Sequence, residues 1–173
     1  MKNYLRLLTV VAVFVLGPSS VNAQTTGSQT FTVIVPTSVS ITAPAAASLT
    51  HDQTETPQAF PAQTWVVRGN STTGMNVSFT SDSFTHATLP TFKQNSRMSL
   101  AVGTTQGPAS WTVGVPTSTS NFLTSTPATV TASSTGIGRA NLNLIVTFVT
   151  DGFGTFASGN YLATVVGTVA ANP

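Results

Sequence analysis

The sequence contains no cysteine, few charged residues and only two histidines. Without cysteine the chain forms no disulfide framework and no thiolate metal site, although small secreted domains often depend on disulfides. Charged residues make up 6% of the chain, against about 25% in ordinary globular domains. The surface must therefore be covered mainly by neutral polar side chains, and few ionisable groups are available for catalysis.

Long hydrophobic runs are also missing. The longest apolar stretch near the start, residues 7–16, is broken by a Gly-Pro pair. A membrane-spanning helix needs about 20 apolar residues, so we expect no stable membrane insertion. Basic residues, a short apolar core and small residues before a cleavage point are the parts of a secretory signal peptide. The sequence predicts such a peptide over residues 1–23, with cleavage between Ala23 and Gln24.

Removal of the signal peptide changes the charge of the chain. The whole sequence has a formal charge of +2, but Lys2 and Arg6 belong to the predicted signal peptide. Six basic residues less these two leave four, against four acidic residues, so residues 24–173 have no net charge. A nucleic-acid partner requires a basic face that displaces counterions from phosphates, and four scattered cations argue against one. The eight charged residues are Arg68, Lys93, Arg97, Arg139, Asp52, Glu55, Asp82 and Asp151.

The rest of the chain shows the period-two pattern of β-strands and no helical period. β-Branched residues are frequent, and proline and glycine interrupt the chain at short intervals. Many short strands without helices between them favour an antiparallel sandwich. We therefore predict a single all-β, Ig-like antiparallel β-sandwich over residues 24–173, with eight or nine strands. The expected strands are 29–35, 38–43, 64–68, 74–84, 98–102, 110–115, 129–132, 140–150 and 161–171, with loops at 44–63 and 103–108 and a turn at Asp151-Gly152.

The histidines and acids do not form a recognisable catalytic or metal-binding set. His51 and Asp52 are adjacent, and a solvated surface pair is the expected arrangement. No Gly-x-Ser-x-Gly motif is present to position a nucleophile. Glycosidase carboxylates must face each other across about 5 to 10 Å, and nothing in the sequence selects such a pair. We predict no catalytic residues, no metal site and no cofactor.

Two tryptophans leave a second function class open. An exposed indole can stack on a sugar ring, so a secreted carbohydrate- or ligand-binding β-sandwich module is the alternative function. Both Trp65 and Trp111 lie within apolar strand segments, which favours burial in the core. Whether either indole is exposed decides the strength of this alternative.

The two ends of the mature chain carry a family resemblance. The first strand region reads QTFTVIVPTSVSITAP, and the end reads ASGNYLATVVGTVAAN. Together they resemble bacterial fimbrial subunits, in particular cysteine-free, Ig-like major pilins of the chaperone–usher type. The chain ends Ala171-Asn172-Pro173, without the penultimate aromatic residue of many pilins.

The resemblance implies a structural or adhesive protein that is secreted or displayed at the bacterial cell surface. In such subunits the N-terminal strand leaves its own domain and completes the sandwich of a neighbour, with alternate apolar side chains inserted. The partners implied are copies of the chain or another surface subunit, and a periplasmic chaperone in transit. An ordinary first strand in its own sheet is the other interpretation of residues 29–35. By position, Phe31, Val33 and Val35 would be the donated side chains, and Tyr161, Ala163, Val165, Gly167 and Val169 would lie in the last strand of the domain.

Overall fold

The computed structural model describes residues 25–150, 152 and 154–173. The predicted signal peptide, its cleavage site between Ala23 and Gln24, and Asp151 of the predicted turn lie outside these residues. Within them the chain forms twelve strands, and none of it forms a helix that could cross a membrane. All twelve strands belong to one unit, Val35–Pro173.

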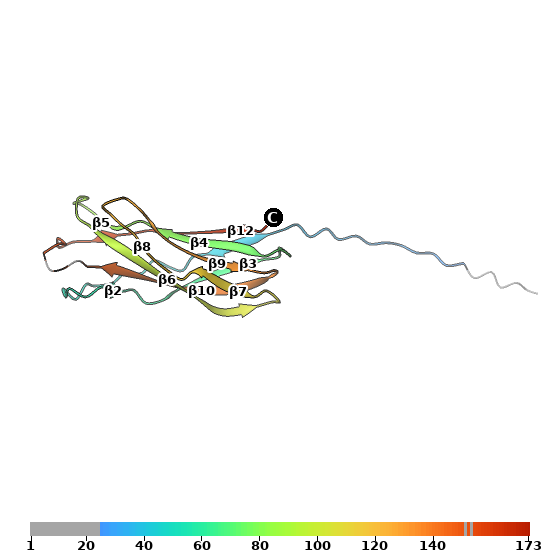
Figure 1. Cartoon of the computed structure of the whole chain (residues 1–173). Coiled ribbons are helices and arrows are strands. Elements are labelled where there is room, and N and C mark those ends of the chain that lie inside the picture. The colour runs from blue at the N-terminus through green and yellow to red at the C-terminus, as the bar shows by residue number, and fades with distance from the viewer. Residues whose placement is uncertain (1–24, 151, 153) are drawn as a thin grey trace, which may run out of the picture. The chain divides into compact units, whose positions relative to one another are not determined.

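Eight strands form one antiparallel sheet. Its long central pair, β6 (Lys93–Gln106) and β10 (Gly138–Val149), is hydrogen-bonded along most of its length. The other six strands are β1 (Val39–Thr42), β2 (Gln58–Ala59), β3 (Gln63–Gly69), β5 (Phe84–His86), β8 (Thr117–Thr119) and β11 (Tyr161–Leu162). The order across this large sheet is β1-β3-β10-β6-β5-β11, with β2 on β10 and β8 on β6. Figure 1 shows the central pair, β6 and β10, side by side.

Four strands form the second sheet, which packs against the first. They are β4 (Met75–Ser81), β7 (Trp111–Val115), β9 (Ala128–Ser134) and β12 (Val165–Ala171), in the order β12-β4-β9-β7. All pairings are antiparallel. The all-β antiparallel sandwich predicted from the sequence is thus confirmed.

The core follows from the alternation of side chains along each strand, which sends every second residue to the same face. In β4 the side chains of Met75, Val77 and Phe79 are buried, whereas Asn76 between them is exposed. The same pattern in the other central strands brings twelve buried side chains into one apolar cluster between the sheets. Besides Val77 and Phe79 it contains Trp65, Val67, Met98, Leu100, Ala128, Val130, Ala132, Ala140, Leu142 and Leu144.

The predicted strand at residues 29–35 is absent from the structure. Its side chains alternate as those of β4 do, except at Ile34, yet these residues form no strand. Alternation only states where side chains would point, whereas a strand exists only when its N–H and C=O groups find a partner. This segment has the sequence of a strand without the pairing of one.

Other predicted boundaries are also corrected. The expected loop at 103–108 is largely strand, because β6 continues to Gln106 by pairing with Arg139 of β10. The expected closing strand 161–171 divides between the two sheets, and Ala163 lies in neither β11 nor β12. Eight of the nine expected strands are present, and four more of two or three residues bring the count to twelve, since alternation is not recognisable over so short a stretch. They are β2, β5, β8 and β11.

Candidate functional site

The most unusual feature of the sandwich is the unpaired outer edge of β12. Along its inner edge β12 pairs with β4 over all seven residues, from Val165 opposite Ser81 to Ala171 opposite Met75. No described strand pairs with its outer edge. The N–H and C=O groups of such an edge are free to pair with a further strand.

The core beneath β12 is incompletely covered. The inward-facing residues of β12 include Val165 and Val169, which pack against the core but are only half-buried. By contrast, the residues opposite them in the neighbouring strand β4, Ser81 and Val77, are 1% and 2% exposed. Apolar surface thus remains open to solvent at this corner of the sandwich, although its removal from water would be favourable.

β12 also differs from the other sheet edges. β1 has four residues and is soon followed by Pro44, while β8 and β11 are still shorter. β7, at the opposite edge of the small sheet, has an irregular register between Val113 and Val115 and is followed by Pro116. Short strands, irregularities and prolines are the devices that protect edges from association. β12, which reads VVGTVAA, is longer than β1, β7, β8 and β11, pairs with β4 in a regular register and has no charge, although Pro173 follows it as closely as Pro44 follows β1.

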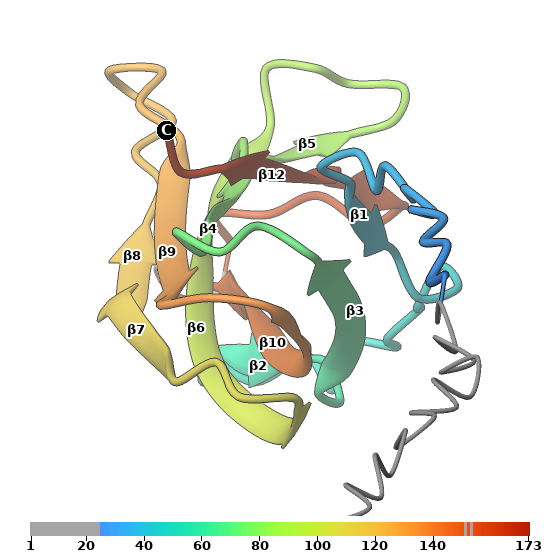
Figure 2. The same cartoon turned by 90° about the vertical axis from the view of Figure 1, so that its right-hand side faces the viewer.

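The neighbour of β12 across the corner of the sandwich is β1, the edge strand of the large sheet (Figure 2). β1 begins at Val39, opposite Gly69, and β12 ends at Ala171, opposite Met75. Since the connection between β3 and β4 lies at one end of the sandwich, β1 and β12 run in opposite directions. The side chain absent at Gly167 lets the two sheets approach, because a Cβ there would lie 2.8 Å from Cζ3 of Trp65 and 2.9 Å from Cδ1 of Ile41.

Asn172 holds the end of β12 in place. Its backbone N–H donates to Gly74 O at 2.9 Å, and its Nδ2 donates to Thr73 O at 2.9 Å. Its carbonyl oxygen accepts from Thr73 Oγ1 at 2.8 Å, and its Oδ1 accepts from Asn76 Nδ2 at 2.7 Å. The free edge of β12 is therefore presented by a strand whose end is fixed by four hydrogen bonds.

The predicted assembly residues lie in the exposed segment before β1. Phe31, Val33 and Val35 are 82%, 85% and 73% exposed, and Ile34 is 86% exposed. Large apolar side chains exposed together mark a binding surface. Residues 25–35 contain no charged side chain, so their transfer into an apolar site would leave no charge without a partner.

A side-chain clasp fixes the backbone directly after this segment. Asn70 Nδ2 donates to Pro36 O at 2.8 Å, and Asn70 Oδ1 accepts from Ser38 N–H at 2.6 Å. The backbone N–H of Asn70 in turn donates to Ser38 O at 3.1 Å. Pro36 and Ser38 are therefore held by Asn70 at the β3–β4 end of the sandwich.

The structure places the two histidines in structural roles. His51, expected at the surface, is half-buried, with its ring centroid 5.5 Å from that of Phe148 and 4.8 Å from that of Phe156. The expectation of a solvated pair with Asp52 was wrong for the histidine, because an aromatic cluster distant in sequence covers its ring. His86 is buried, and its Nδ1 accepts from Leu89 N–H at 3.0 Å while Nε2 lies 3.0 Å from Ser158 O.

Asp52 organises the loop before β2. Its Oδ1 accepts from the backbone N–H and from Oγ1 of Thr54, at 2.9 and 2.7 Å, and from Nε2 of Gln58. Bonds to the ionised carboxylate, first of all that from the Thr54 hydroxyl, hold the pKa of Asp52 below its usual value. This arrangement is that of an Asx turn, which explains the carboxylate without a catalytic role.

A pH-dependent contribution to stability follows from Asp52. A lowered pKa in the folded state means that ionised Asp52 stabilises the fold above the pKa of the unfolded chain, and that this contribution is lost as the pH falls through the folded-state pKa. Wild type is expected to melt at a higher temperature than Asp52→Asn at pH 6, with the difference shrinking below about pH 4. Thermal unfolding of both proteins from pH 6 to pH 2.5 measures this, and a difference independent of pH would rule the explanation out.

The tryptophans are not exposed platforms. Trp65 is 8% exposed and packs edge-to-face on Phe79 with ring centroids 5.1 Å apart. Trp111 is half-buried and packs against the core cluster. Among the described residues no three His, Asp or Glu side chains gather in a way that could hold a metal ion.

The fold and its edge define a class: a cysteine-free, two-sheet β-sandwich with one long, regular and unguarded edge strand. No family model, curated protein or solved structure matches the chain. The site alone therefore indicates a function.

Proposed function

We propose that this protein is an exported, non-enzymatic structural subunit that assembles head to tail. In this proposal residues 29–35 of one copy add a strand to the free edge of β12 in the next copy. The observation that carries it is the β12 edge itself, which is seven residues long, uncharged and backed by half-buried valines. Strand addition of this kind takes its affinity from main-chain hydrogen bonds and its specificity from alternate side chains.

The strand order supports the proposal because one position of an Ig-like sandwich is vacant. The order β1-β3-β10-β6 matches strands A-B-E-D of that arrangement, and β12-β4 matches F-C of the opposite sheet. In Ig-like domains strand G lies beyond F. Here the G position is the outer edge of β12, where no described strand is found.

The exposed segment has the chemistry that the vacant position requires. Phe31, Val33 and Val35 alternate along it and can cover the apolar surface left open beside Val165 and Val169. Burial of one such side chain contributes about 1.5–3 kcal/mol. Three together therefore offset a substantial part of the translational and rotational entropy lost on association.

A second copy fits the vacant position better than the chain's own segment. β1 begins four residues after Val35, so a segment folded back beside β1 would run antiparallel to β1 and hence parallel to β12. A strand from another copy is free to run antiparallel to β12. Antiparallel pairs are slightly more stable per residue, and every pairing in this sandwich is antiparallel.

The proposal includes a cellular location and a chaperone. An exported subunit that polymerises belongs outside the cell or on its surface. Until assembly, the edge of β12 and the segment 29–35 would be open to aggregation. A periplasmic chaperone that covers either one during transit is therefore part of the proposal.

The test replaces the apolar face of the segment. Phe31→Asp, Val33→Asp and Val35→Asp are introduced together, and the matched control carries Thr30→Asp and Thr32→Asp on the opposite face. We expect the wild-type chain to form linear polymers visible by negative-stain electron microscopy, and the triple variant to sediment only as monomer. The control is expected to polymerise, because its carboxylates point away from the core of the acceptor.

Two results would overturn the proposal. One is a wild-type mature chain that stays monomeric at millimolar concentration while its segment 29–35 remains protease-sensitive. The other is a triple variant that polymerises as well as the control. Melting temperatures of all three proteins, measured alongside, exclude misfolding as the cause.

A further inference from the structure

We propose that the outer face of the large sheet binds carboxylate groups of an acidic polysaccharide, through Arg68 and Arg139. This site lies on the other sheet from β12 and does not depend on the assembly proposal. The proposal is based on the gathering of the cationic residues on one face of the fold, which the sequence does not reveal. The four cationic residues of the mature chain alternate with buried neighbours in β3, β6 and β10, and all therefore lie on the outer face of one sheet.

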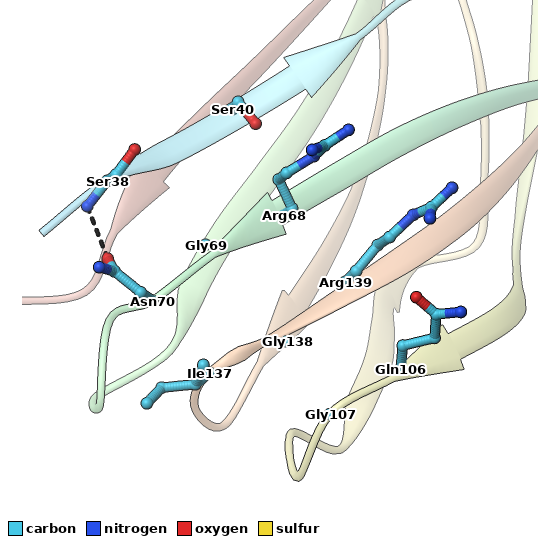
Figure 3. Close-up of a pocket in the computed structure, with 10 residues that line it drawn as sticks. All are labelled: Ser38, Ser40, Arg68, Gly69, Asn70, Gln106, Gly107, Ile137, Gly138 and Arg139. Carbon is cyan, nitrogen blue, oxygen red and sulfur yellow. Dashed lines mark hydrogen bonds between the residues drawn. The ribbon is translucent and has the colours of Figure 1, made fainter.

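Two of these cations are direct neighbours. Arg68 of β3 lies opposite Arg139 of β10 in the register, and such residues have Cβ atoms about 4.5–5.5 Å apart. Figure 3 shows the two side chains extending side by side in the same direction. Like charges in directly opposed positions destabilise a sheet, so an anion bound to both side chains would stabilise it.

No acidic side chain that the structure describes lines this part of the sheet. Among the described residues no hydrogen bond or ion pair involves either guanidinium group. Asp52 and Glu55 lie in the loop before β2, and Asp82 lies between β4 and β5. A guanidinium group is never deprotonated in proteins and carries five donors in a planar fork, so both groups are free to bind an oxyanion in a bidentate manner.

Neutral polar groups flank the arginine pair. Across four neighbouring strands the register aligns Ser40, Arg68, Arg139 and Gln106 in one row. The row borders a shallow, open depression of about 410 Å³ at the β3–β4 end of the sheet (Figure 3). Hydroxyl and amide groups beside a cation pair suit a ligand that carries both hydroxyl groups and a carboxylate. The depression is also lined by Ser38, Gly69, Asn70, Gly107, Ile137 and Gly138.

The charge density favours a polyuronate over a nucleic acid. Double-stranded DNA presents one charge per about 1.7 Å of its axis, and two adjacent cations neutralise little of it. A uronic-acid polymer carries one carboxylate per sugar and many hydroxyl groups, which corresponds to the two charges and the polar rim of this site. Arg97 and Lys93 lie farther along β6 on the same face and serve as an internal control.

The experiment measures binding of the mature chain to immobilised polygalacturonate by biolayer interferometry. The probes for comparison are fully methyl-esterified polygalacturonate and double-stranded DNA. We expect binding to polygalacturonate that weakens with salt, and no binding to the methyl ester. Arg68→Gln with Arg139→Gln is expected to weaken binding at least about tenfold, because a hydrogen bond to a charged group contributes enough for such a factor. Lys93→Gln with Arg97→Gln should change it less than about threefold.

Several outcomes would overturn the site. They are equal binding to the polymer and its methyl ester, tighter binding to DNA, equal losses in the two double variants, or no binding by wild type. Folding is monitored by thermal unfolding at low salt. There the Arg68→Gln, Arg139→Gln variant is expected to melt no lower than wild type, since a repulsive pair is removed.

Discussion

A truncated chain that begins at Pro36 is expected to fold into the same sandwich and to form no polymer. All twelve strands and the Asn70 clasp lie at or after Pro36, so the truncation removes no internal contact of these elements. What it removes is the strand that the proposal assigns to the neighbouring subunit. Circular dichroism measures whether the truncated chain keeps the β-sheet fold, and size-exclusion chromatography measures whether it polymerises.

A peptide is expected to restore what the truncation removes. Residues 25–35 as a synthetic peptide should bind the truncated chain and raise its free energy of unfolding, by about 2.7 kcal/mol at one hundred times its dissociation constant. A control peptide with serine in place of Phe31, Val33 and Val35 keeps the backbone and should produce no shift. If both peptides stabilise the chain equally, pairing at β12 is not driven by these side chains.

Replacing Phe79 with alanine is expected to lower the free energy of unfolding by about 3–5 kcal/mol. Phe79 is 0% exposed, lies at the middle of the core, and contacts Trp65. Loss of a buried aromatic removes its transfer free energy and leaves a cavity. Since a domain of this size has a total stability of about 5–15 kcal/mol, the variant should be close to unfolding at 37 °C.

Urea denaturation of Phe79→Ala and of a control measures this loss. The control is Leu123→Ala, because Leu123 is 81% exposed and surface changes usually stay within about 0.5 kcal/mol. A loss below about 1 kcal/mol in Phe79→Ala would show that the core between β3 and β4 is not packed as described.

The sequence was sufficient to predict the class of fold because alternation is a local signal. The segment 140–150 and the second half of 161–171 were close to β10 and β12 for this reason. Alternation predicted one strand too many and missed part of another, because the presence of a strand also depends on a pairing partner. It predicted a strand at 29–35, where no partner strand is present, and it missed residues 103–106, which β10 holds in β6.

The candidate site was only half predictable. The apolar face of Phe31, Val33 and Val35 is visible in the sequence, whereas the free edge of β12 is a property of strand order, which no local pattern contains. The same holds for Arg68 and Arg139, which are 71 positions apart and become neighbours only through the register of β3 and β10. Charge counting had treated the four cations as scattered, and it is the register that places them on one face.

Low charge and the free edge are connected. The outer face of the small sheet carries Ser78, Thr80, Thr129, Thr131 and Thr168, with no charged residue in any of its four strands. Charged edges protect monomeric β-proteins from association. Because the small sheet has no such charges, the outer edge of β12 is suited to pairing with a partner strand.

The central claim is that residues 29–35 of one copy pair with β12 of another, and disulfide trapping tests it most directly. The natural chain has no cysteine, so introduced thiols have no competitors. Thr32→Cys in one copy is mixed with Val166→Cys, Thr168→Cys or Ala170→Cys in a second copy of different mass, all on the outer face of the joined strands. Directly opposed residues of an antiparallel pair are within disulfide range.

We predict a mixed covalent dimer for at least one of the three mixtures after mild oxidation, and none with Thr131→Cys on the central strand β9 as control. No dimer in any mixture would contradict the account. So would an intramolecular disulfide, formed in preference to the dimer when both cysteines are placed in one chain, because it would assign the segment to its own sandwich.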